Sequence, residues 1–110
     1  MNRLVLNLFL FALSSTLTAQ KINQEIKIEE NQPFLVGQID LAGLTSNSYN
    51  SWYSTNHKAY QVDTEIISSI KNELTQYKIL IFMGTWCGDS KREVPRFIKT
   101  LEAANFPMEN

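Results

Sequence analysis

The chain opens with a short apolar leader that is followed by polar sequence. Arg3 precedes an apolar run from Leu4 to Leu13, and small and hydroxyl residues continue to Ala19. A basic residue, a short apolar run and a small residue at the end form the layout of a secretory signal peptide. The run is only about half of the roughly 20 apolar residues that a spanning helix needs. We therefore predict that residues 1–19 form a cleaved signal peptide. An uncleaved membrane anchor and a buried N-terminal helix are the less favoured alternatives.

Two short extended patterns come next. Ile26 and Ile28 alternate with charged residues, which is typical of an edge strand or an extended arm. The stretch 34–44 predicts a second short strand, broken by Gly37, with a turn near Gly43.

A helical pattern with an aromatic face follows from Ser46 to Tyr60. A Ser or Asn at its start is suited to cap it. The aromatic residues that recur at helical spacing are Tyr49, Trp52, Tyr53 and Tyr60. We expect this face to pack in the core rather than to bind a partner. His57 has no cysteine or second histidine near it in the sequence, so we expect it to be solvated or capping and not a metal ligand.

The second half of the chain predicts a helix, a buried strand and another helix. Asp63 or Thr64 is suited to cap an amphipathic helix that runs to Tyr77. Five apolar residues without alternation, Ile79–Met83, are typical of a strand buried on both faces, so Ile79, Ile81 and Phe82 are expected inside. A last helix should pack Val94, Phe97 and Leu101 against that strand. Pro95 should kink this helix, and Asn105 and Pro107 should end it.

Composition and charge limit the partners that the chain can be expected to bind. Ten Lys and Arg against eleven Asp and Glu give a formal net charge of −1, and no basic patch favours nucleic acid or anionic lipid. We expect neither a nucleic-acid partner nor a stable membrane anchor. The chain has one cysteine, Cys87, so an internal disulfide is impossible. In an exported protein this thiol is buried and inert, paired with another molecule, or chemically active.

The position of Cys87 favours the third alternative, a chemically active thiol. It stands where the predicted strand enters the predicted helix, and the unpaired N–H groups of a helix N-terminus stabilise a thiolate. Thiolate is the nucleophile in disulfide exchange. Trp86 would shield one side of the sulfur, and Gly88 allows a tight turn. Asp89 should raise the thiol pKa while Lys91 and Arg92 lower it, and the sequence does not give the net direction.

Taken together, the apolar strand, Trp86-Cys87-Gly88-Asp89-Ser90 and a helix containing Pro95 resemble the thioredoxin family, whose motif is Trp-Cys-Gly-Pro-Cys. The resemblance implies an α/β, thioredoxin-like fold. It divides the chain into the signal peptide, an N-terminal extension over 20–62 and the N-terminal part of the domain over 63–110. In that family further strands and helices follow the motif helix, and the sequence stops at Asn110, so we expect a fragment of a longer protein.

Ser90 stands where the family has its second, resolving cysteine. A hydroxyl does not attack a disulfide at a useful rate, so Cys87 would form a mixed disulfide that only an external thiol releases. The resemblance therefore implies a periplasmic or secreted thiol–disulfide exchange protein. Its site residues are Cys87, Ser90 and Trp86, without cofactor or metal. The expected partner is a cysteine-containing protein or a small thiol.

The sequence also bears on three other functions. A non-catalytic binding module would keep Cys87 as a structural residue and dock a partner on the aromatic face around Trp52 and Tyr53. Peroxidase families place a threonine three residues before the cysteine, where this chain has Gly84, while Thr85 is two before it. Iron–sulfur binding in one-cysteine glutaredoxins uses Cys-Gly-Phe-Ser, and Asp89 does not fit it.

Overall fold

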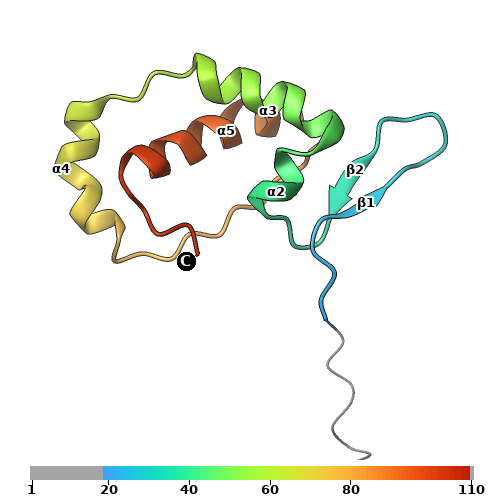
Figure 1. Cartoon of the computed structure of the whole chain (residues 1–110), viewed down its shortest axis with the longest axis horizontal. Helices are drawn as coiled ribbons and strands as arrows, with labels where there is room; N and C mark the ends of the chain where they lie inside the picture. Colours follow the sequence, from blue (N-terminus) through green and yellow to red (C-terminus); the bar gives the residue numbers. More distant parts are fainter. Residues whose placement is uncertain (1–18, 110) are drawn as a thin grey trace, which may run out of the picture.

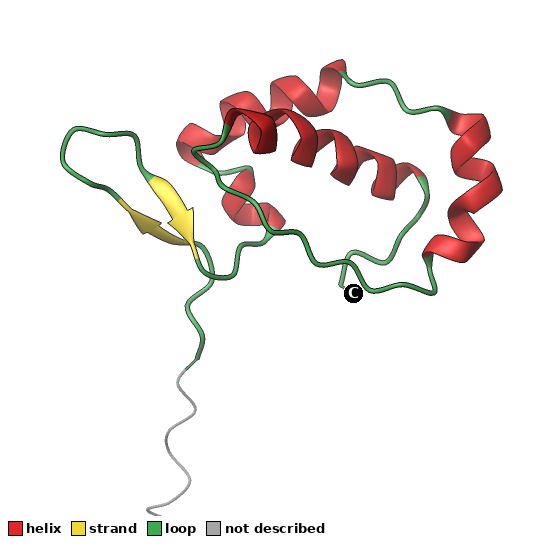
Figure 2. Cartoon of the chain, turned by 180° about the vertical axis from the view of Figure 1, so that it is seen from behind, coloured by secondary structure: helices red, strands yellow, loops and turns green. Residues whose placement is uncertain are grey.

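The computed structural model describes residues 19–109, so the predicted signal peptide, apart from Ala19, lies outside the described residues. The described part combines helices with one two-stranded antiparallel sheet (Figures 1 and 2). The elements, in chain order, are β1 (Gln24–Ile26), β2 (Phe34–Val36), α2 (Leu41–Leu44), α3 (Asn47–Ala59), α4 (Thr64–Leu74) and α5 (Gly88–Ala103). Within this range no helix has the length and apolar character to cross a membrane.

The core lies between α3 and α5, which run side by side in both views (Figures 1 and 2). Apolar side chains from β2, α2, α3 and α5 share it: Leu35, Leu44, Tyr49, Tyr53, Val94 and Ile98. Burial of such side chains is the main stabilising term in a small domain. The predicted aromatic face is therefore confirmed as packing, since two of its tyrosines are buried and Trp52 packs against the cluster.

Both core tyrosines are held neutral by their surroundings. Burial, and then the hydrogen bond that Tyr49 donates to Glu25 at 2.8 Å, raises the pKa of Tyr49 to about 12. Burial, and then the negative charge of Glu102, raises the pKa of Tyr53 to about 12. The Tyr49 bond also ties β1 to α3, because Glu25 lies in the middle of that strand.

Several helix boundaries follow from local chemistry. Asp63 caps α4 as predicted, since its carboxylate accepts the N–H groups of Glu65 and Ile66, both at 3.1 Å. The helix ends at Leu74, earlier than the predicted Tyr77. The predicted turn near Gly43 is wrong, because Gly43 lies inside α2 and donates its N–H to the capping carboxylate of Asp40.

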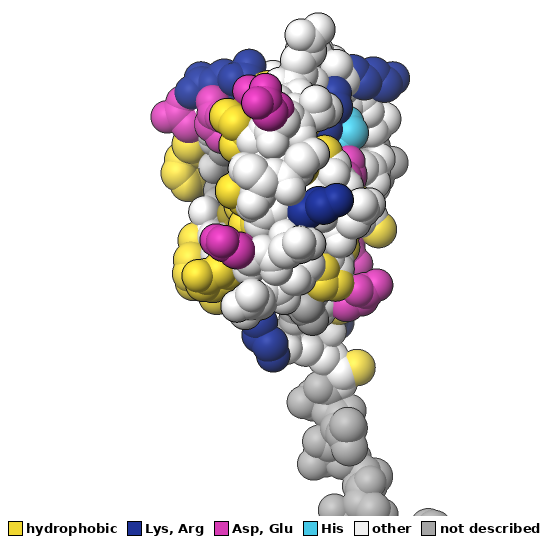
Figure 3. Space-filling model, turned by 90° about the vertical axis from the view of Figure 1, so that its left-hand side faces the viewer, with side chains coloured by type: hydrophobic (Ala, Val, Ile, Leu, Met, Phe, Trp, Pro, Cys, Tyr) yellow, Lys and Arg dark blue, Asp and Glu magenta, His cyan; other side chains and the backbone are white. Residues whose placement is uncertain are grey.

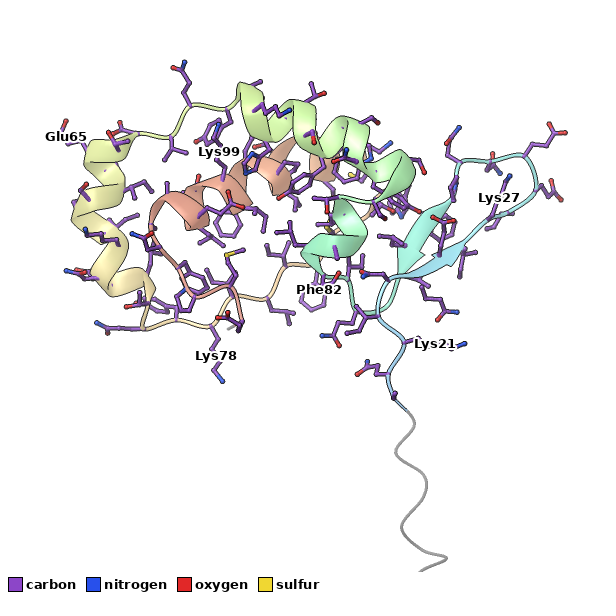
Figure 4. All side chains as sticks on the ribbon, in the orientation of Figure 1. Lys21, Lys27, Glu65, Lys78, Phe82 and Lys99 are labelled. Carbon is purple, nitrogen blue, oxygen red and sulfur yellow. The ribbon has the colours of Figure 1, made fainter. Side chains whose placement is uncertain are left out.

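The predicted buried strand over Ile79–Met83 is also wrong. The segment is extended but forms no strand, and in the described range none of its backbone groups has a hydrogen-bond partner. Leu80 is 78% exposed and Phe82 is 90% exposed, and Figure 4 shows Phe82 projecting away from α3 and α5. Ile81 is exposed as well, whereas Ile79 is half-buried. A strand requires a neighbour for its backbone, and the two described strands pair only with each other.

The motif helix matches its prediction more closely. α5 begins at Gly88, contains Pro95 and ends at Ala103, ahead of Asn105 with its φ of 53°. Val94, Ile98 and Leu101 are buried, while Phe97 is 40% exposed, so its expected place in the core is wrong. Without a strand beside it, the Phe97 side of α5 has less to pack against.

Candidate functional site

Cys87 lies at the N-terminus of α5, where the chain turns out of the extended segment. Its N–H donates to the carbonyl of Gly84 at 3.0 Å, which closes the turn. Its own carbonyl accepts the N–H of Lys91 at 2.9 Å, the first bond of the helix. Cys87 therefore occupies the cap position, with extended backbone angles (φ −86°, ψ 124°). The free N–H groups of the first helical turn therefore lie near its side chain, although the sulfur accepts no capping hydrogen bond from them.

These N–H groups act on the half-buried thiol. The pKa of Cys87 lies below its ordinary value, because the backbone N–H of Ser90, the Ser90 hydroxyl and then the backbone N–H of Asp89 stabilise the thiolate. Burial and the negative charge of Asp89 act in the opposite direction and are smaller. The structure thus gives the net direction that the sequence left open, and helix N–H groups rather than basic side chains produce it.

Arg92 does not face the thiol as a free cation. Its Nη2 lies 2.8 Å from Asp89 Oδ1, and its Nε lies 2.6 Å from Glu93 Oε1. Arg92 therefore pairs with Asp89, whose negative charge raises the pKa of the Cys87 thiol.

The Ser90 hydroxyl holds the turn in which Cys87 lies. Its Oγ accepts the N–H of Gly84 at 3.2 Å, so the hydroxyl connects the end of the extended segment to the first turn of α5. Because its hydroxyl also stabilises the Cys87 thiolate, Ser90 links the shape of the turn to the charge state of the thiol.

The indole of Trp86 packs close to the backbone of Gly84, two residues earlier in the turn. A Cβ at Gly84 would lie 2.7 Å from Trp86 Cε2, so only glycine leaves room for the indole there. The indole itself is 72% exposed. Leu80 and Phe82, on the segment that leads into this turn, are exposed large apolar side chains as well.

Thr85 is a residue of this site that the sequence analysis missed. It is 3% exposed, and its Oγ1 accepts the backbone N–H of Leu35 at 3.0 Å. This bond joins β2 to the motif turn across 50 residues of sequence. The sequence shows only a hydroxyl residue between Gly84 and Trp86, shortly after an apolar run. This pattern does not indicate that Thr85 binds the backbone of Leu35.

A second group of charged side chains lies at the other end of α3 and α5. His57 Nε2 lies 2.8 Å from Glu102 Oε2, and the imidazole stacks on the Tyr53 ring with centroids 5.8 Å apart. Lys99 donates to the carbonyl of Tyr60, and Figure 4 shows its position near the end of α3. A shallow open groove lies beside these residues. The expectation that His57 is solvated or capping was wrong, since its side chain is half-buried and joins α3 to α5 through Glu102.

Neither group is arranged as a metal centre. Within residues 19–109, no three His, Cys, Asp or Glu side chains gather as ligands for an ion. The face of the molecule that carries α4 shows apolar side chains along one margin, with acidic and basic side chains interspersed (Figure 3).

Comparison of the chain with family models, with curated proteins and with solved structures gave no match. A function must therefore be argued from the residues themselves and from their geometry.

Proposed function

We propose that this chain is an exported, thioredoxin-like protein that carries out thiol–disulfide exchange through Cys87. The observation that carries the proposal is the position of Cys87 as the cap of α5, where helix N–H groups lower the thiol pKa. A thiol with this bias is more strongly ionised near neutral pH, and the thiolate is the attacking species.

The exchange step balances with one external disulfide. The Cys87 thiolate attacks one sulfur of that disulfide and forms a new S–S bond, and the old S–S bond breaks. The second sulfur leaves as a thiolate and takes up a proton from water. Ser90 supplies no second thiolate, so the mixed disulfide persists until an external thiol, such as a small thiol or a protein cysteine, displaces Cys87.

A non-catalytic binding module is the second candidate, and one specific observation favours it. Leu80, Phe82 and Trp86 are exposed large apolar side chains, and in the described part of the chain the backbone of residues 79–83 is unpaired; exposed apolar surface of this kind is typical of an interaction site. This surface differs from the aromatic face around Trp52 that the sequence suggested.

Reaction with oxidised glutathione separates the two candidates. The exchange protein should give a one-to-one adduct at Cys87 that is stable until a reducing thiol is added, as followed by intact mass. Ser90→Cys should convert this capture into turnover, because the second thiol would stand one helical turn away. A folded chain that forms no adduct, and whose Cys87 reacts only in denaturant, would support the binding module instead.

A further inference from the structure

Cleavage after Ala19 would leave Gln20 at the N-terminus of the mature chain. Glutamine is a residue whose side chain can react with its own terminal amine. We propose that Gln20 is converted to pyroglutamate after export. This modification rests on the export step of the proposed function and is independent of its thiol chemistry.

The reaction uses only atoms that Gln20 carries. The uncharged α-amine attacks the carbon of the side-chain amide, and the new C–N bond closes a five-membered lactam. The bond from that carbon to the amide nitrogen breaks, and ammonia leaves with the proton that the amine gives up. No oxidant, reductant or co-reactant is consumed. An ordinary α-amine has a pKa of about 7.7–8.0, so a fraction is uncharged and nucleophilic near neutral pH.

The structure leaves Gln20 free to react. Residues 19–22 are exposed, and in the described range no hydrogen bond joins them to the rest of the molecule. Figure 4 shows Lys21 on the segment that leads away from the folded body. The amine and the amide of Gln20 can therefore approach each other without breaking a tertiary contact.

The folded body begins at Asn23. Its N–H donates to the carbonyl of Gln38 at 2.9 Å, and its Nδ2 donates to Asp40 Oδ1 at 2.6 Å. Asp40 returns a bond from its own N–H to Asn23 Oδ1 at 3.0 Å. These contacts hold the start of β1, so closing a ring at Gln20 leaves the fold unchanged. The modified chain loses one positive charge and the free amine that aminopeptidases require.

The test is mass spectrometry of the N-terminal peptide from the full chain, expressed in an exporting cell and recovered outside the cytoplasm. The expected peptide begins at residue 20, lacks one molecule of ammonia and takes up amine label on lysine side chains but not on an α-amine, until pyroglutamyl aminopeptidase exposes the α-amine of Lys21. Gln20→Asn is the matched control, because asparagine would need a strained four-membered ring and should keep a free amine.

A free Gln20 amine on the exported protein would overturn the modification and leave both export and the thiol chemistry standing. A mature N-terminus at another residue, or intact Met1 in the cytosol, would overturn the modification together with the predicted cleavage. Failure of Cys87 to react with disulfides would affect neither result, so the separate steps fail in distinguishable ways.

Discussion

Replacing Thr85 by valine tests whether one buried hydrogen bond holds the N-terminal hairpin to the motif turn. The Thr85 hydroxyl is the acceptor for the backbone N–H of Leu35, at 3.0 Å in a buried environment. Valine keeps the branched shape of threonine but places a methyl group where the acceptor was, so the Leu35 N–H loses its partner. A buried donor left without a partner costs about 1–3 kcal/mol. We expect Thr85→Val to lower the free energy of unfolding by about 2 kcal/mol.

Urea unfolding followed by tryptophan fluorescence measures this loss, since Trp52 packs against the core. With a slope of about 1–2 kcal/mol per molar urea, the midpoint should fall by about 1–2 M. Thr55→Val is the matched control, because Thr55 is exposed on α3 and its hydroxyl donates only to the carbonyl of Ser51. This control should change stability by no more than about 0.5 kcal/mol. Equal midpoints for the two variants would refute the role of Thr85 in holding the hairpin.

Three further predictions follow from the same structure. Phe82→Ala should cost less than about 1 kcal/mol in urea unfolding, because Phe82 is 90% exposed. Since the pKa of both Tyr49 and Tyr53 is about 12, the unfolded chain loses phenolic protons first, and the free energy of unfolding should fall as pH rises from about 10 to about 12. Ser90→Ala should raise the pKa of Cys87, measured by alkylation, while the backbone N–H groups keep part of the lowering.

Local signals in the sequence were sufficient for the three longer helices, α3, α4 and α5, but not for α2. The aromatic spacing of 46–60 predicted α3, the Asp63 cap predicted the start of α4, and the helical spacing after Gly88 predicted α5. Each of these features depends on residues within a few positions of one another, such as a carboxylate and the N–H groups of the next turn.

The errors concern features that depend on distant partners. An apolar run such as Ile79–Met83 shows that burial would be favourable, but it does not supply the neighbouring strand that makes burial possible. Likewise, Thr85 is buried because β2 lies beside it, and His57 is half-buried because Glu102 faces it from α5. In both cases a contact between distant segments overrides what the local sequence predicts.

The most direct test of the central claim is the alkylation rate of Cys87 as a function of pH, in the folded chain and in the same chain unfolded by urea. The pKa of the folded thiol should lie below that of the unfolded one, which should be near the free-thiol value of about 8.5, because helix N–H groups stabilise the folded thiolate. A folded thiol that titrates at or above the unfolded value, or that resists alkylation at every pH at which the chain stays folded, would contradict it.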